Sequence, residues 1–216
     1  MNFIEIQMEQ WSRKAHYEHY KNNIPCSYSI TVDIDISNLL TGLKERGMKS
    51  YAAQVYMLSS VVNQLPEFRM TMSDDHRLGY WEVMDPMYTV FDSITETFSA
   101  VWTKYDSCYS TFYSAFLQDT ARYGDGSLFP QEHIPPNTFN ISSVPWLDFT
   151  AFNINVFSDG NYLLPIFTIG KYRKKDDKIM MPLAIQCHHA VCDGYHVGKF
   201  VEALREMAIN CDKWLL

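Results

Sequence analysis

The chain has 216 residues, of which 47% are hydrophobic and 20% charged, a composition typical of a packed globular protein and unlike a disordered one. Lys and Arg number 18 against 25 Asp and Glu, so the net charge is −7, which argues against nucleic acid as a partner. No apolar run is long enough to span a bilayer, so no membrane insertion is expected.

The N-terminal segment and the cysteines bear on the cellular compartment. The start, MNFIEIQMEQW, lacks a basic leader and a long apolar core, so we expect no signal peptide and a cytoplasmic location. Cysteines are odd in number and form no CxxC, which favours free thiols over disulfides or a zinc site. Aromatic residues make up 15% of the chain, which fits a pocket for an apolar or aromatic ligand.

The first half of the chain mixes helices with strands. Strict alternation of apolar and polar residues at 30–36 predicts a strand with one buried face. Ser50 is a candidate cap for a helix that runs to Leu65. The other elements expected here are a short helix at 11–21, strands at 78–83, 88–91 and 97–102, and a helix from Tyr109 to near Gly124.

Strands dominate the second half. The Gly- and Pro-rich residues 124–137 predict a long loop, which in a compact domain is often functional. The expected elements are strands at 139–142, 149–157, 163–172 and 180–188, turns at Asp159-Gly160 and 171–178, and an amphipathic helix after Gly194. Because the helices are scattered among the strands, the pattern predicts an α/β two-layer sandwich, a mixed β-sheet covered by helices, in a single domain of residues 1–216.

The stretch 183–194 is the richest in chemistry, because a β-type run ends in two histidines and turns through Asp193-Gly194 into a helix. Successive strand residues point to opposite faces, so His188 and His189 are expected to face different surroundings. An imidazole at a strand end, with a carboxylate four residues on, suits general base catalysis near neutral pH.

Other interpretations of these residues remain open. A lone buried histidine is more often structural than catalytic. A metal site could use His189, Asp193 and His196, but a turn separates them and neither HExxH nor paired CxxC motifs support it, so no metal is expected. The chain contains no G-x-S-x-G nucleophile elbow and no complete dinucleotide-binding loop.

The run His188-His189-Ala190-Val191-Cys192-Asp193-Gly194 resembles the HHxxxDG signature of CoA-dependent acyltransferases. Further segments, in order from Trp11 to the last helix, are similar to those of the chloramphenicol acetyltransferase family. They are W-S-R-K-A-H-Y at 11–17, I-P-C at 24–26, E-T-F-S-A at 96–100, L-F-P-Q at 128–131, N-I-S-x-x-P-W at 140–146, P-I-x-T at 165–168 and K-Y at 171–172.

The resemblance implies acetyl transfer from acetyl-CoA to the primary hydroxyl of chloramphenicol within a ternary complex, with no covalent enzyme intermediate. It assigns His189 as the general base and Ser142 as the donor that stabilises the oxyanion. Asp193 is implied to pair with Arg13 and Thr168 to act through water, all three as structural supports. Without the resemblance, Ser142 would be an ordinary serine at a strand end.

The resemblance also implies the binding sites, an acetyl-CoA cosubstrate in place of any resident cofactor, and a homotrimer with its sites at subunit interfaces. Residues matched to the drug pocket are Tyr20, Ile24, Cys26, Thr89, Phe98, Phe129, Trp146 and Ile166, and Tyr172 is matched to CoA binding. For each ring, plain core packing is the alternative. Two other functions stay open, an acyltransferase for a different acceptor and a drug-binding module without turnover.

Overall fold

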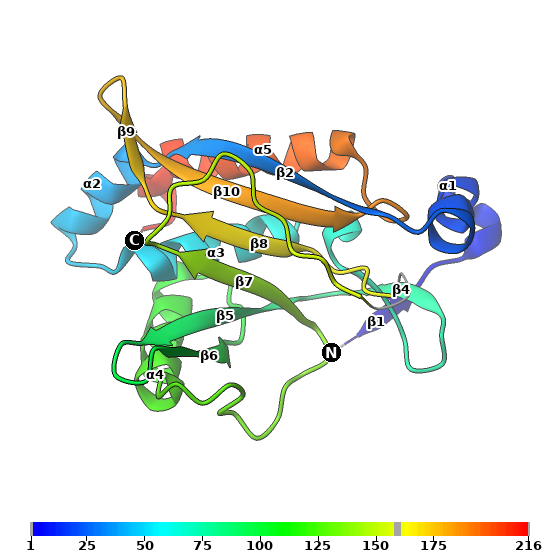
Figure 1. The fold of residues 1–216 in the computed structure, drawn as a ribbon, viewed down its shortest axis with the longest axis horizontal. Helices are drawn as coiled ribbons and strands as arrows, with labels where there is room; N and C mark the ends of the chain where they lie inside the picture. Colours follow the sequence, from blue (N-terminus) through cyan, green and yellow to red (C-terminus); the bar gives the residue numbers. More distant parts are fainter. Residues whose placement is uncertain (1, 158–160, 216) are drawn as a thin grey trace.

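The main feature of the computed structural model, which describes residues 2–157 and 161–215, is a seven-stranded mixed sheet (Figure 1). Its strands are β2 (Ser27–Asp35), β5 (Asp85–Asp92), β6 (Thr97–Trp102), β7 (Thr138–Val144), β8 (Ile166–Gly170), β9 (Arg173–Lys175) and β10 (Lys178–His188). They run in the order β2-β10-β8-β7-β5-β6, with β9 paired to β10. β7 is parallel to both β5 and β8, and the other pairs are antiparallel.

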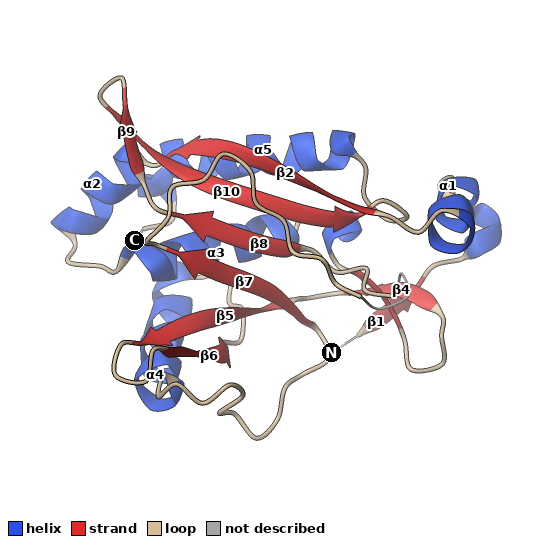
Figure 2. Ribbon diagram, in the orientation of Figure 1, coloured by secondary structure: helices blue, strands red, loops and turns tan. Residues whose placement is uncertain are grey.

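Helices cover one face of this sheet (Figure 2). They are α2 (Ser37–Glu45), α3 (Ser50–Val62), α4 (Tyr109–Tyr123) and α5 (Gly194–Ile209), while the short α1 (Lys14–Glu18) lies at the end of the sheet where β10 ends. The segment after β7 crosses the opposite face (Figure 1). The predicted fold class, a mixed sheet covered by helices, is therefore confirmed.

The core lies between the sheet and the helices, and aromatic rings join its two layers. Phe167 of β8 stacks on Phe200 of α5 with ring centroids 5.1 Å apart, and Phe200 also contacts Phe68 at 4.6 Å. Helix α3 is buried at every position from Ala52 to Val62, so it is a central helix packed on all sides rather than an amphipathic one.

A second, three-stranded antiparallel sheet has the order β1 (Phe3–Glu5), β4 (Leu78–Trp81), β3 (Met70–Met72). Gly79 is required where β4 meets β1, because a Cβ there would lie 2.4 Å from the Phe3 ring and 2.5 Å from the Ile4 carbonyl oxygen. This small sheet is separate from the seven-stranded sheet that carries the site.

Several boundaries differ from the sequence-based expectation. The strand expected at 149–157 is wrong, since these residues form no strand. The main-chain N–H of Ile154 donates to the Gln186 side chain, 2.9 Å away, instead of to a neighbouring strand. The turn expected at Asp159-Gly160 lies outside the described residues. The helix expected at 11–21 is α1 followed by a wide π-helical turn at His19–Asn23, and α3 ends at Val62 instead of Leu65. Elements that the pattern missed are α2, β1, β3 and β9.

Removing the ring of Phe200 should destabilise the fold by about 3–5 kcal/mol, the usual effect of Phe→Ala in a core. Its side chain is fully buried against Phe68 and Phe167, so its removal leaves a cavity between them. Unfolding in urea measures the change, and Glu202→Ala on the exposed face of α5 is the control, expected within about 0.5 kcal/mol of wild type. Equal effects of the two substitutions would contradict this role of Phe200.

Candidate active site

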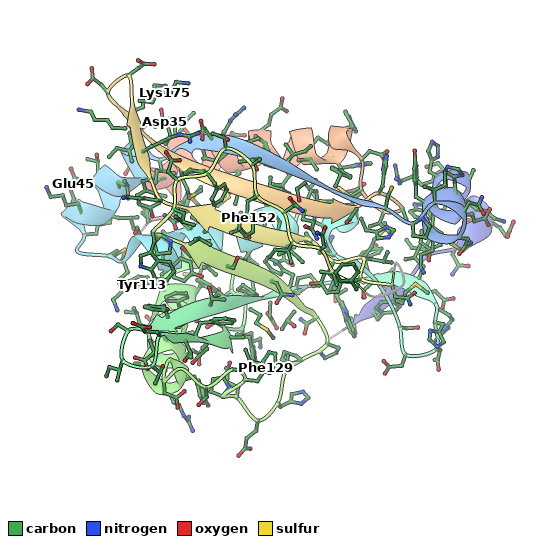
Figure 3. All side chains as sticks on the ribbon, viewed as in Figure 1. Asp35, Glu45, Tyr113, Phe129, Phe152 and Lys175 are labelled. Carbon is green, nitrogen blue, oxygen red and sulfur yellow. The ribbon has the colours of Figure 1, made fainter. Side chains whose placement is uncertain are left out.

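Most of the residues predicted for the site fall into two groups in different parts of the sheet. His189, Asp193, Arg13 and Tyr20 lie together where β10 ends, with Cys26 beside them. The other group lines a large cavity and consists of Ser142, Thr89, Phe98, Trp146 and Tyr172. Phe129 belongs to neither group and lies on the loop after α4, on the β6 side of the sheet (Figure 3).

His189 is held on both its backbone and its ring. Its N–H donates to the carbonyl oxygen of Cys26 at 3.0 Å, which ties the residue after β10 to the residue before β2. The Tyr20 ring stacks on the imidazole with centroids 4.0 Å apart, and Tyr28 meets it edge-on at 5.4 Å. About a third of the side chain is exposed, so the imidazole is accessible while its plane is fixed.

Asp193 and Arg13 form the predicted ion pair, and it also supports the backbone of His189. The Arg13 guanidinium donates to both carboxylate oxygens of Asp193 and to the carbonyl oxygens of His189 and Ala190, at 3.3 and 3.4 Å. These hydrogen bonds hold the pKa of Asp193 below its ordinary value, although partial burial opposes them. Asp193 Oδ1 lies 3.2 Å from His189 Nδ1, without hydrogen-bond geometry.

His188 occupies a different environment from His189. It is 5% exposed, its Nδ1 accepts the N–H of Ala190 at 3.2 Å, and it lines a cavity of about 120 Å³ together with Cys26. Burial lowers its pKa to about 4, so the ring is neutral near pH 7. His188 is therefore the buried, structural histidine of the pair.

Ser142 lies in β7 directly opposite Thr168 of β8. The two hydroxyl oxygens are 2.9 Å apart in a hydrogen bond, and Thr168 is buried. The neighbouring main-chain N–H, that of Ser143, donates to Thr89 Oγ1 at 3.3 Å. The Ser142 hydroxyl is therefore oriented by its strand partner, at the wall of the large cavity.

The large cavity has a volume of about 950 Å³, at the upper end of the range for small-molecule sites. It lies between α3 and α4 on one side and β5 to β8 on the other. Tyr172 is fixed in its wall, because its hydroxyl accepts the Gln54 side-chain N–H and donates to Ser50 Oγ at 3.4 Å. The lining of the cavity includes two lysines and several aromatic rings: Lys49, Lys171, Tyr51, Phe91, Phe116 and Trp146.

The sheet register separates the two groups within one chain. Ser142 pairs with Thr168, and Thr168 pairs with Ala184 of β10. From Ala184 the chain continues to His189, which at ~3.3 Å per residue carries it ~17 Å along the sheet, and two strand spacings of ~4.8 Å add the lateral separation. β7 and β8 run toward one end of the sheet and β10 toward the other (Figure 1). His189 and Ser142 of one chain therefore do not reach the same substrate atom.

Several residues of the site were not found from the sequence. Tyr28 donates its hydroxyl to the Cys192 carbonyl oxygen at 3.1 Å, and Gln54 holds Tyr172, but neither has a recognisable sequence signal. The sequence singled out His196 only as a possible metal ligand. In the structure it accepts the Asp193 N–H, and its position three residues after a helix cap is a signal that could have shown this. Within the described residues, no group of three or more His, Cys, Asp or Glu is arranged to hold a metal ion. No helix in residues 2–157 and 161–215 is both long and apolar enough to cross a membrane.

The fold is that of the CoA-dependent acyltransferases. A solved dihydrolipoamide acetyltransferase from Azotobacter vinelandii superposes with a TM-score of 0.63 at 15% identity, over 94% of this chain and 88% of that one. A solved chloramphenicol acetyltransferase superposes with a TM-score of 0.86 at 20% identity, over 96% of this chain and all of the other.

Sequence comparison defines the family more narrowly. The family model for chloramphenicol acetyltransferase matches residues 1–205. The chloramphenicol acetyltransferase of Clostridium butyricum is 46% identical over 216 residues, which span 100% of this chain and 99% of that protein. The chain belongs to the chloramphenicol acetyltransferase family, and the predicted resemblance is confirmed.

The contact between Arg13 and Asp193 predicts non-additive effects of substitution. Asp193→Asn and Arg13→Ala should each destabilise the protein, because each leaves a partly buried polar group with a lost partner. The double variant should lose less stability than the sum of the two single losses, by about 0.5–3 kcal/mol. Urea unfolding of all four proteins measures this, and additivity within about 0.5 kcal/mol would show that the pair does not interact.

The lowered pKa of His188 should account for part of the loss of stability in acid. Since its pKa is about 4 in the folded chain against an ordinary 6.5, the unfolded chain binds its proton first as the pH falls. The free energy of unfolding should therefore decrease from about pH 6.5 to about pH 4. In His188→Gln, which keeps a side-chain acceptor for the Ala190 N–H but does not titrate, the decrease should be shallower. Identical slopes for both proteins would contradict the buried, neutral state of His188.

Proposed function

We propose that the protein transfers an acetyl group from acetyl-CoA to the primary hydroxyl of chloramphenicol. The observation that carries the proposal is the presence, in a chain of this family, of both a fixed, accessible imidazole at His189 and a hydroxyl at Ser142 that lines a large cavity. The first residue supplies a base and the second a hydrogen-bond donor, the two groups that acyl transfer to an alcohol requires.

The large cavity is the site for acetyl-CoA in this proposal. Its volume and its rings suit a long cosubstrate with a partly apolar body, and Lys49 and Lys171 suit the phosphates. Ser142 is part of the same wall, so a thioester bound in the cavity would bring its carbonyl to that hydroxyl. Tyr172, held by Gln54 and Ser50, is a rigid contact for the cosubstrate.

The chemistry proceeds in two steps. His189 takes the proton of the acceptor hydroxyl while that oxygen attacks the thioester carbonyl, and the Ser142 hydroxyl donates to the resulting oxyanion. When the tetrahedral intermediate collapses, the C–S bond breaks and the CoA sulfur leaves with the proton from His189. Because Nδ1 faces Asp193, Nε2 is the nitrogen that carries the proton. Asp193 and Arg13 position the imidazole.

The two half-sites meet between subunits in this proposal. Since one chain holds His189 and Ser142 far apart, a complete site requires His189 of one chain and Ser142 of another, and a cyclic homotrimer provides three identical contacts of this kind. Apolar side chains from the predicted drug pocket support this, because Ile24, Phe98 and Phe129 are 57%, 45% and 58% exposed. Ile166, predicted for the same pocket, is buried in β8.

Release of CoA thiol tests the activity directly. With acetyl-CoA present, thiol release should depend on chloramphenicol and should fall by about 10²–10⁴ in His189→Ala and about 10²–10³ in Ser142→Ala. Both variants should still bind chloramphenicol in equilibrium dialysis, because the base acts on the proton and not on holding the drug. Thiol release only with a different alcohol, or binding with no turnover by the unmodified protein, would contradict the proposal.

Mixing the two inactive variants tests the shared site. If His189→Ala and Ser142→Ala chains are unfolded and refolded together, roughly a quarter of the interfaces in a random ring pair an intact histidine with an intact serine. Thiol release should then rise well above that of either parent. If the mixture matches the average of its parents after subunit exchange has been verified by mass, the two residues act within one chain and the shared site is wrong.

A further inference from the structure

His196 fixes the backbone of the residue that supports the proposed base. The main-chain N–H of Asp193 donates to His196 Nδ1 at 2.9 Å, and the His196 N–H donates back to the Asp193 carbonyl oxygen at 2.9 Å. Asp193 is the N-cap of α5 and His196 is the third residue of the helix, the position from which a side chain reaches back to the cap. A histidine does here what Glu or Gln does in most such caps.

This hydrogen bond determines the protonation of the His196 ring. Because Nδ1 accepts a hydrogen bond from the backbone N–H, it carries no proton itself, and the neutral ring has its proton on Nε2. Nε2 lies 3.6 Å from Glu67 Oε1, on the 3-10 turn Pro66–Phe68. The side chains of His196 and Glu67 are 13% and 22% exposed, so water competes little for either contact.

The side chain of Asp193, whose N–H His196 holds, lies between Arg13 and His189. Asp193 Oδ1 and Oδ2 accept from Arg13, and Oδ1 approaches His189 Nδ1 at 3.2 Å. A rotation of the backbone at Asp193 would therefore move the carboxylate relative to both partners. His196 is connected to the site through this backbone and reaches neither Ser142 nor the large cavity.

We propose that His196 is a pH-sensitive positioning residue, whose unprotonated Nδ1 holds Asp193 in place and whose protonation releases it. A protonated Nδ1 would be a donor facing the Asp193 N–H, so the clamp cannot exist in the imidazolium form. The inference rests on the proposed acetyl transfer, since it concerns the residues that position its base.

The groups that face His196 set the direction of its titration. Burial lowers its pKa, Glu67 and Asp193 raise it, and Arg13 and Lys199 lower it, with a net value below the ordinary one for histidine. The clamp is therefore intact at neutral pH and opens in mild acid. The acid limb of kcat/KM should then contain a component from protonation of His196, which disappears when residue 196 cannot titrate.

Three variants separate this role from a merely structural one. His196→Gln keeps a side-chain acceptor at the third helix position but does not titrate, so it should recover most of the turnover at pH 7.5 and lose the His196 component of the acid limb. His196→Ala has no acceptor, so kcat should fall about 10- to 100-fold, as expected for a displaced catalytic group, with the KM for acetyl-CoA little changed. Glu67→Gln removes a charge that raises the pKa of His196, so the acid limb should move to lower pH.

Hydrogen exchange at the Asp193 amide tests the clamp without turnover. The amide should be protected in the unmodified protein and in His196→Gln, and should exchange faster in His196→Ala. If the unmodified protein releases no thiol, the proposed function fails, while the exchange measurement still decides the clamp. Equal losses of kcat in His196→Gln and His196→Ala, an unchanged acid limb in His196→Gln, or an Asp193 amide equally protected in all three proteins would overturn the inference.

Discussion

The pairing register across β7, β8 and β10 is the constraint on which the rest of the site depends. Ser142, Thr168 and Ala184 lie side by side across three strands, and His189 follows Ala184 only after the end of β10. Since a strand is stiff and its spacing fixed, no side-chain rotation brings the imidazole to the serine. The register thus turns one chain into two half-sites, one around the base and one around the cavity, and the proposed ring of subunits follows from it.

Around the base, order comes from polar contacts that share one carboxylate. Asp193 links Arg13 to His189, and the Arg13 guanidinium also binds the carbonyl oxygens of His189 and Ala190. With one charge of each sign partly buried, neither partner can be removed without leaving the other poorly solvated. The neutral His188 stabilises the turn after β10, since its Nδ1 accepts the Ala190 N–H. The result is an imidazole held by its backbone and by the stacked Tyr20 ring, with Asp193 Oδ1 3.2 Å from its Nδ1.

The sequence was informative where a pattern has a short-range cause. Alternation located β2, the apolar spacing located α4 and α5, and β6 has the expected bounds at Thr97–Trp102. The segment 149–157 has strand-like residues but lies over the sheet without pairing, because Gln186 binds its main chain, a long-range contact that no local pattern reveals. The residue pattern singled out the histidine pair and Asp193, and the resemblance assigned the roles of His189 and Ser142. The division into two groups, by contrast, depends on strand register between distant segments. Tyr28, Gln54 and Glu67 were missed for the same reason, since each acts on a residue far along the chain.

The most direct test of this account is an experimental structure with chloramphenicol and CoA bound together. The account predicts that the primary hydroxyl of the drug lies within about 3 Å of His189 Nε2 of one chain, the distance required of a general base. The CoA sulfur should lie in the large cavity of a neighbouring chain, beside its Ser142. A drug hydroxyl and a CoA sulfur that meet between His189 and Ser142 of the same chain would contradict it.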